Sequence, residues 1–554
     1  MNSAPLRALR IDPRDNAAVA LTPLEANTDL VVDGETYRLL DPISAKHKFA
    51  CVDLALGDTV KMYGVVVGRT TQVVRRGAAL TTGNIAHQVG EYAIGNLNPI
   101  WTPPDVSAWR DKTFAGYHRS DGSVGTQNLW IVIPLVFCEN RNVEVMRQSI
   151  NRALGFDSAS RYERYAGSLV DALRRGASPA ELENLRLEEA LQQSAARAKD
   201  YPMLDGVRFL THGLGCGGTR QDSQALCGLL AGYATHPNVA GVTVLSLGCQ
   251  IAEVKMLEAE IAQRAPRFDR PFHVFNQQKH GSESSLMSDA IRATILGASR
   301  AGEQTRSPAG IDKLTLGLEC GGSDGFSGIS ANPVIGATSD RIVALGGKTV
   351  LAEFPELCGA EQSLIDRCVD RPTAERFVSL MEAYEAGAQA VGSAMHFNPS
   401  PGNIRDGLIT DAIKSTGAAK KGGTSPIVDV LDYPEKVSRP GLSLLCTPGN
   451  DVESTTALAG SHCNLIVFST GLGTPTGNAI TPVIKLSSNT TLARAHPELI
   501  DFDTGSVIDG SRTISDLGDD LLQRCIDVAS GEIPTCADVL GQQDFLPWKR
   551  GVSL

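Results

Sequence analysis

The stretch KLTLGLECGGSDGFSGISANP (residues 313–333) joins a strand-length apolar run to a glycine-rich loop that carries Cys320 and Asp324. Its first seven residues have the length and composition of a buried strand, and the glycines that follow favour a tight loop. Ligands of open parallel sheets bind outside the carboxyl ends of the strands. Side chains in this loop are therefore candidates for a functional site.

The same pattern recurs along the chain from about residue 114. Apolar runs of strand length alternate with longer amphipathic stretches, which is typical of parallel sheets covered by helices. The expected strands are residues 129–137, 206–212, 241–248, 313–319, 348–354, 442–447 and 464–470. We therefore predict an α/β fold whose large body contains parallel, doubly wound sheets.

The chain is too long for one hydrophobic core, because compact domains usually have about 100–200 residues. Residues 1–94 contain short β-like segments separated by Gly, Asp and Pro, which predicts a small β-rich domain. Residues 95–113 are rich in Gly, Asn and Pro and are expected to form a linker. We divide the body into residues 114–310 and 311–554, with a helical insert at about 150–200.

Composition argues against two classes of partner. The formal net charge of −11 gives no basic excess of the kind that a nucleic-acid surface needs. No run reaches the about 18 apolar residues that span a bilayer, and residues 1–21 contain no signal-peptide core. We expect a cytoplasmic protein that binds neither nucleic acid nor a membrane, with its twelve cysteines reduced.

Three cysteines follow expected strands, each beside a glycine. Cys216, Cys249 and Cys320 come after the second, third and fourth of the strands given above. Thiolates from separate loops suit Fe(II) or Zn(II), and three protein ligands leave one position open for a substrate. The spacing slightly favours a metal site. Buried structural cysteines and a single catalytic thiol are the alternatives.

Other polar loops offer further candidates, each with a plainer structural interpretation. His212 shares a loop with Cys216, and the string AEFPE contributes Glu353 and Glu356. The strings NPSPGN (398–403) and STGLGTPTG (469–477) are either simple turns or cradles for a carboxylate and several hydroxyls. Lys421 is either an anion contact or a solvated lysine.

Several longer strings together resemble the altronate and galactarate dehydratase family over nearly the whole chain. They include HKFA, RSDGSVGTQN, LECGGSDGFSGISANP, FPELCGAEQ, NPSPGN, TPGNDVESTTALAG, STGLGTPTG and IKLSSNTTLA. The resemblance implies an N-terminal SAF (β-clip) domain and an iron- or manganese-dependent hydro-lyase. Such an enzyme would convert a 2,3-dihydroxy sugar acid, for example D-altronate, into a 2-keto-3-deoxy acid. Fe(II) is the expected cofactor, with Mn(II) or an iron–sulfur cluster as alternatives, and a homodimer is expected.

The resemblance also implies roles for residues in these motifs. The expected metal ligands are Cys216, Cys249 and Cys320. The base and the acid are expected among His47, His212 and Glu353. The residues expected to bind substrate are Asp324, Asn403, Lys421, Asp451, Thr470, Thr474 and Lys485.

The chain departs from the family pattern at several positions. Gln127, Ile404 and Leu472 stand where the family usually has a cation, and Thr476 stands where it has a tyrosine. Because such cations can bind a substrate carboxylate, these departures leave the substrate open. The alternatives are galactarate or another aldonic or aldaric acid, sulfolactate with sulfite as the leaving group, and a sugar-acid sensor without catalysis.

Overall fold

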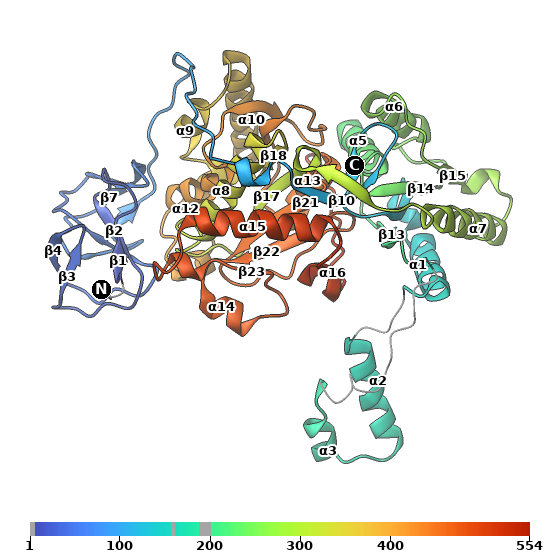
Figure 1. The fold of residues 1–554 in the computed structure, drawn as a ribbon, viewed down its shortest axis with the longest axis horizontal. Coiled ribbons are helices and arrows are strands. Elements are labelled where there is room, and N and C mark those ends of the chain that lie inside the picture. Colours follow the sequence, from blue (N-terminus) through green and yellow to red (C-terminus); the bar gives the residue numbers. More distant parts are fainter. Residues whose placement is uncertain (1–5, 157–160, 188–200) are drawn as a thin grey trace.

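The computed structural model describes residues 6–156, 161–187 and 201–554. A small β domain lies beside a large α/β body, and an extended segment joins them (Figure 1). The body contains two parallel sheets, so the predicted α/β fold with an N-terminal β domain is confirmed. In the part of the chain that is described, no helix is long and apolar enough to cross a membrane.

The N-terminal domain is built from short antiparallel strands. They form a four-stranded sheet, a hairpin and a three-stranded sheet: β1 (Ala8–Leu9), β2 (Ala17–Ala20), β5 (Lys48–Ala50) and β8 (Ala79–Leu80); β3 (Asp29–Val32) and β4 (Glu35–Arg38); β6 (Thr59–Met62), β7 (Val65–Thr70) and β9 (Ile85–Ala86). Tyr37 and Phe49 pack in a core of its own. A second apolar cluster joins the domain to the body, because Tyr63 and Val67 pack there with Phe326 and Ile413.

The first body sheet has four parallel strands in the order β13 (Gly206–Phe209), β12 (Leu129–Pro134), β14 (Val239–Ser246) and β15 (Phe272–Asn276). Side chains alternate between its faces. Trp130 and Val132 pack with α1 (Asn140–Leu154) and α7 (Glu283–Ala301), whereas Ile131 and Ile133 pack with α5 (Arg220–Ala234) and α6 (Val254–Arg264). Helices therefore cover both faces of this sheet.

The helical insert expected at about 150–200 is helical where it is described. α2 (Arg161–Arg174) and α3 (Pro179–Asn184) project away from the body (Figure 1). Residues 157–160 and 188–200 lie outside the described part of the chain.

The second body sheet has seven parallel strands. Their order is β19 (Ile427–Leu431), β20 (Gly441–Leu445), β18 (Lys348–Leu351), β17 (Thr315–Cys320), β21 (Leu465–Thr470), β22 (Val483–Ser487) and β23 (Phe502–Asp503). The chain leaves β17 toward β18 and later returns to the other side of β17 as β21. The carboxyl ends of β17 and β21 thus form a topological switch point, where ligands of such sheets bind.

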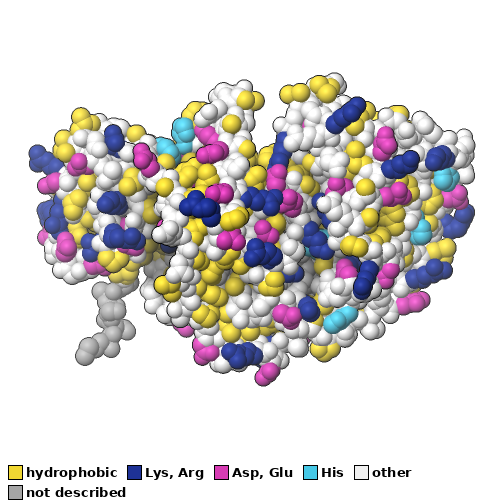
Figure 2. All heavy atoms as spheres, turned by 90° about the horizontal axis from the view of Figure 1, so that it is seen from above, with side chains coloured by type: hydrophobic (Ala, Val, Ile, Leu, Met, Phe, Trp, Pro, Cys, Tyr) yellow, Lys and Arg dark blue, Asp and Glu magenta, His cyan; other side chains and the backbone are white. Residues whose placement is uncertain are grey.

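Helices cover both faces of the seven-stranded sheet as well. α8 (Ala331–Ala344), α10 (Arg371–Ala390) and α15 (Ile514–Ala529) pack on one face. α13 (Asp451–Gly460) packs on the other, where it also contacts α5 of the first sheet. A small antiparallel sheet of β10 (Thr113–His118), β11 (Val124–Gly125) and β16 (Ser307–Gly310) lies near the linker. Positive and negative side chains are interspersed over the face shown in Figure 2.

The contact between α5 and α13 requires glycine. A Cβ atom at Gly232 would lie 2.1 Å from the carbonyl oxygen of Gly460. We predict that Gly232→Ala lowers the melting temperature, because overpacking typically costs about 1–3 kcal/mol and here outweighs the gain in helix propensity. The control is Gly167→Ala in α2, where an added Cβ meets nothing within 4 Å. A Gly232→Ala protein that melts at or above the parent temperature would contradict this packing.

Candidate active site

A buried cluster of thiol, carboxyl and ammonium groups lies at the carboxyl end of β17. Cys320 ends β17, Glu353 follows β18, and Lys421 belongs to the 3-10 turn η7 (Lys420–Gly422). Lys421 Nζ donates to Cys320 Sγ at 2.7 Å and to Glu353 Oε2 at 2.8 Å. None of the three residues is more than 1% exposed. A buried ammonium thus links the ends of two neighbouring strands.

Lys421 keeps its charge because its partners outweigh the cost of burial. Desolvation lowers the pKa of Lys421, but the charges of Cys320 and Glu353 raise it, and the net pKa lies well above the usual value. Burial and the Glu353 charge raise the pKa of Cys320 well above its usual value, and the Lys421 charge acts against them. The titration of the thiol is therefore tied to that of its two neighbours.

A second ion pair completes the cluster. Glu356 belongs to the turn η5 (Phe354–Leu357), and its Oε2 lies 3.5 Å from Cys320 Sγ. Lys414 of α12 (Asp411–Ala419) donates to Glu356 Oε1 at 2.6 Å and to Asn398 Oδ1 at 3.1 Å. Burial would raise the pKa of Glu356, but the charges of Lys414 and Lys421 lower it. Glu356 is therefore an ionised carboxylate held between two lysines.

Glu353 is held in an unusual backbone conformation. Its φ of 69° and ψ of 63° are left-handed, which costs a non-glycine residue about 1–3 kcal/mol. The backbone N–H of Glu353 donates to Thr447 Oγ1 at 2.8 Å, and the backbone N–H of Cys320 donates to Glu353 Oε2 at 3.3 Å. Among the described residues, its buried Oε1 has no hydrogen-bond partner. Backbone strain combined with a free acceptor oxygen is typical of a functional carboxylate.

Two further carboxyl groups hold protons more tightly than usual. Burial and the nearby Glu353 charge raise the pKa of Glu319 well above its ordinary value, and Ser454 donates to it at 2.6 Å. Burial, with the charges of Glu353 and Glu356, raises the pKa of Asp451 to about 7. A Cβ atom at Gly321 would lie 1.9 Å from Asp451 Oδ2, so the glycine lets this carboxyl reach the loop. Glu319 and Asp451 thus hold a proton more tightly than usual, whereas the pKa of Glu356 in the same cluster is lowered.

The N-terminal domain covers the neighbouring loop. Lys46 Nζ lies 2.9 Å from Asp324 Oδ2 and 3.1 Å from Asp406 Oδ1. Lys48 Nζ donates to the carbonyl of Gly407, and burial lowers its pKa to about 7. His47 Nε2 lies 3.0 Å from the carbonyl oxygen of Arg405. The His47 ring thus lies at the domain interface and contacts the backbone of the body at Arg405.

Three predicted substrate residues shape the loops beside the cluster. Asn403 donates to the carbonyl of Ser323 at 2.7 Å. Thr470 Oγ1 accepts the N–H groups of residues 472–474 and lies 3.5 Å from Thr474 Oγ1. These side chains are engaged in holding the loops that follow β17 and β21.

The three cysteines predicted to bind a metal follow strands of two different sheets. Cys216 and Cys249 lie in adjoining exposed loops, where the carbonyl of Gly215 accepts the N–H groups of residues 251 and 252. Among the described residues, no group of three metal-ligating atoms within 4.8 Å of one another includes Cys216 or Cys249. These two loops follow strands of the four-stranded sheet, whereas Cys320 ends a strand of the seven-stranded sheet, and the metal role of the three cysteines stays a prediction.

The side chains of His212, a predicted acid or base, and Lys485, a predicted substrate contact, bind other protein groups. The His212 Nε2 atom lies 2.8 Å from the carbonyl oxygen of Pro134, and its Nδ1 accepts the N–H of Leu214 at 3.1 Å. Burial lowers the pKa of His212 to about 4, so the neutral ring has no nitrogen left for proton transfer. Lys485 lies within β22, away from its carboxyl end, and its ammonium donates to Gln542.

Sequence reasoning assigned no role to Glu356, Lys414 or Asn398. Glu356 had a visible signal, because it follows Glu353 by three residues in the same loop. Asn398 opens the NPSPGN string, whereas Lys414 had no signal, because only the tertiary fold brings α12 against η5.

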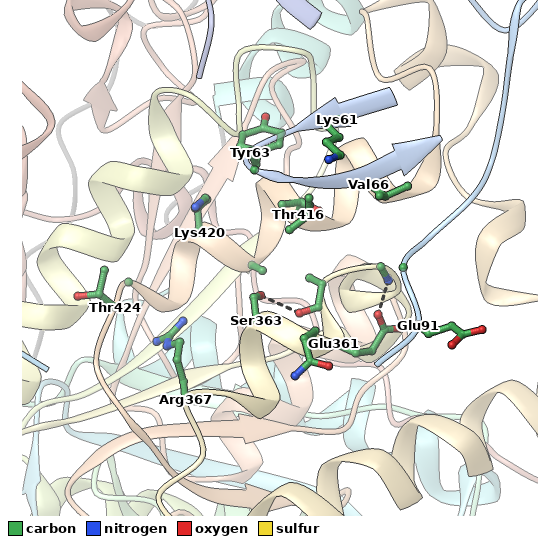
Figure 3. Close-up of a pocket in the computed structure, with 18 residues that line it drawn as sticks. Lys61, Tyr63, Val66, Glu91, Glu361, Ser363, Arg367, Thr416, Lys420 and Thr424 are labelled. Carbon is green, nitrogen blue, oxygen red and sulfur yellow. Dashed lines mark hydrogen bonds between the residues drawn. The ribbon is translucent and has the colours of Figure 1, made fainter. Parts of the chain in front are cut away.

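Two cavities approach this region. One of about 620 Å³ is lined by Asn398, which contacts the cluster, and by Tyr384, Trp548 and Arg550. The other, of about 510 Å³, lies between the β6–β7 hairpin and the body. Figure 3 shows Lys61, Lys420 and Arg367 around this second space, together with Glu361. The first cavity therefore reaches Asn398, which contacts Lys414 of the cluster.

Three sequence profiles of known families match the chain in order. Residues 6–88 match the altronate/galactarate dehydratase SAF domain. Residues 116–301 match the second domain of D-galactarate dehydratase/altronate hydrolase, and residues 311–553 match the C-terminal domain of D-galactarate/altronate dehydratase. The SAF domain expected at the N-terminus is confirmed.

Full-length relatives agree with the profiles. Altronate dehydratase of Escherichia coli (strain K12) is 32% identical over 99% of this chain and 100% of its own length. Altronate dehydratase of Bacillus subtilis (strain 168) is 30% identical over 86% of each chain. Galactarate dehydratase (L-threo-forming) of E. coli (strain K12) is 28% identical over 97% of this chain and 95% of its own. The prediction of a lyase enzyme is confirmed, and the chain belongs to the altronate/galactarate dehydratase family.

Proposed function

We propose that this chain is a hydro-lyase that removes water from a sugar acid such as altronate and yields a 2-keto-3-deoxy acid. The relatives named above support the substrate class. The observation that carries the proposal is the cluster at the switch point, where Glu353, Asp451 and two buried lysines meet. Dehydration beside a carboxylate needs these parts: a base, an acid and fixed positive charge.

Glu353 is the proposed base. Two observations support this role: its backbone is strained, and its Oε1 accepts no hydrogen bond from an N–H or hydroxyl group of the described residues. Loss of the C2 proton builds negative charge on the substrate carboxylate, and Lys421 and Lys414 supply charges that stabilise it. The electron pair of the broken C2–H bond then forms the C2–C3 double bond.

Asp451 is the proposed acid. A carboxyl with a pKa of about 7 is partly protonated at neutral pH and can donate to the leaving 3-hydroxyl. The C3–O bond breaks as that proton arrives, and water departs. The resulting enol becomes the 2-keto acid when a proton returns to C3. The charges of Glu353 and Glu356 help to raise the pKa of Asp451, and a raised pKa suits a group that must carry a proton.

The cluster does not fit a divalent metal well. Cys320, Glu353 and Glu356 do present ligand atoms within 4.8 Å of one another. However, Lys421 Nζ already contacts two of these residues, and Lys414 Nζ contacts the third. A cation would have to displace both ammonium groups, so no step of the proposed reaction is assigned to a metal at this place.

Substrate choice depends on the loops around the cluster. Leu472 replaces a cation of the family pattern, and an added Cβ at Gly322 would lie 3.3 Å from the Leu472 Cβ. Gln127, another departure, donates to Asp538 at 3.5 Å and thus contacts α16 (Cys536–Leu540). Leu472, the replacement that lies beside the cluster, is therefore apolar and offers no charge to a second carboxylate. This favours an acid with one carboxylate, such as altronate, over the dicarboxylate galactarate.

The reaction can be tested with the full-length protein in reduced, anaerobic, iron-supplemented buffer. We expect 2-keto acid from altronate, less from galactarate, and no sulfite from sulfolactate. Lys421→Met should lower kcat by about 10²–10⁴-fold, because it removes the buried charge that faces the enediolate. Lys420→Met is the matched control, since Lys420 is exposed next to it, and its kcat should remain near the parent value. Binding of altronate without turnover would instead favour a sensor.

The proposed acid makes a separate prediction about pH. Because Asp451 donates a proton, kcat/KM should fall as the pH rises through about 7. Asp451→Asn cannot donate a proton, so activity should be low throughout and this alkaline limb should disappear. A pH–rate profile of both proteins checks this. An unchanged alkaline limb in Asp451→Asn would exclude Asp451 as the titrating group.

A further inference from the structure

A second set of ligand-type side chains meets where the N-terminal domain contacts the body. His87, Cys358 and Asp411 each present one ligand atom, and the three atoms lie within 4.8 Å of one another. His87 follows β9, Cys358 follows η5, and Asp411 is the first residue of α12. α12 contacts β7 of the N-terminal domain, and Figure 1 shows it on the side of the body that faces this domain. Only the docked domains bring these residues together.

Two of the polar atoms in this set are buried without a partner. Asp411 is 1% exposed, and its Oδ2 has no hydrogen bond among the described residues. The Nδ1 atom of His87 is also buried and unpartnered within the described chain. Nearly all buried polar atoms in folded proteins are paired, so two unpaired polar atoms in one cluster require an explanation.

We propose that His87, Cys358 and Asp411 bind one divalent transition-metal ion. An imidazole nitrogen, a thiolate sulfur and a carboxylate oxygen form a mixed donor set that suits Zn(II) or Fe(II). Mg²⁺ and Ca²⁺ prefer sites made only of oxygen. The His396 ring stacks on His87 with 5.0 Å between the ring centroids and 19° between the planes, which fixes the orientation of the imidazole.

The site has an open side. Cys358 and His396 line a cavity of about 300 Å³, together with Tyr92, Glu361 and Glu385. Three protein ligands leave a tetrahedral ion one further position, and the cavity gives water or a small ligand access to it. The ion could therefore exchange with solvent without unfolding the domain interface.

The position of the ion links it to the catalytic cluster. Cys358 follows Glu356 by two residues, and Asp411 precedes Lys414 by three residues on α12. Glu356 and Lys414 form the ion pair described above. An ion at this site would hold both sides of that pair in place and would tie His87 of the N-terminal domain to the body. The metal proposal itself does not depend on the reaction proposed above.

The test uses the full-length protein, stripped of metal by a chelator under anaerobic, reducing conditions and titrated with Co(II). We expect one equivalent of Co(II) with a thiolate-to-cobalt charge-transfer band, and displacement of that band by Zn(II). Cys358→Ser should remove the band, and His87→Ala should weaken binding by more than about 100-fold, which exceeds the usual effect of losing an outer contact. Asp411→Asn, which preserves volume, should weaken binding as well.

Cys216→Ser is the matched control, because Cys216 is exposed and belongs to no three-ligand group among the described residues. It should keep the stoichiometry, the affinity and the band. Circular dichroism of each variant confirms that it is folded. A parent protein that binds neither Co(II) nor Zn(II), or a folded Cys358→Ser protein that keeps the full band, would overturn the proposal. Since the readout is metal binding, a failure of the dehydratase assay leaves this result unaffected.

Discussion

The buried ammonium of Lys421, held between Cys320 and Glu353, is the interaction on which the rest of the site depends. A charge removed from water is tolerated only where partners compensate it, and here the two strand ends supply them. Two neighbouring features support this arrangement. The left-handed backbone of Glu353 directs its carboxylate at the lysine, and the second pair, Glu356 with Lys414, balances the remaining negative charge.

This arrangement explains why the N-terminal domain docks where it does. Thr410 starts α12 as its N-cap and also donates to the carbonyl of Val67 in β7 at 2.8 Å. The helix that carries Lys414 is therefore anchored to the small domain as well as to the body. The shared apolar cluster around Tyr63 and Phe326 adds to this contact. Domain docking and the placement of a catalytic-site lysine are two consequences of the same helix.

Much of the fold could be predicted from local pattern, and the site could be predicted only in part. Each of the seven expected strands overlaps an observed strand, because buried parallel strands appear as continuous apolar runs. Cys320, Glu353, Lys421 and Asp451 were all candidates and do come together. The metal role of the three cysteines stays a prediction: Cys216 and Cys249 follow strands of one sheet and Cys320 ends a strand of the other, and a sequence does not say which strands share a sheet.

The sequence by itself determined the fold class, the SAF domain, the family and the loop chemistry at the end of β17, since each is written in contiguous residues. The tertiary structure alone decided which polar groups meet. His212 turned out to bond backbone through both ring nitrogens, whereas Lys414, on a helix without any motif, became part of the cluster. Burial and pairing of charge depend on segments far apart along the chain, and these set the pKa of Asp451 and the unpaired oxygen of Asp411.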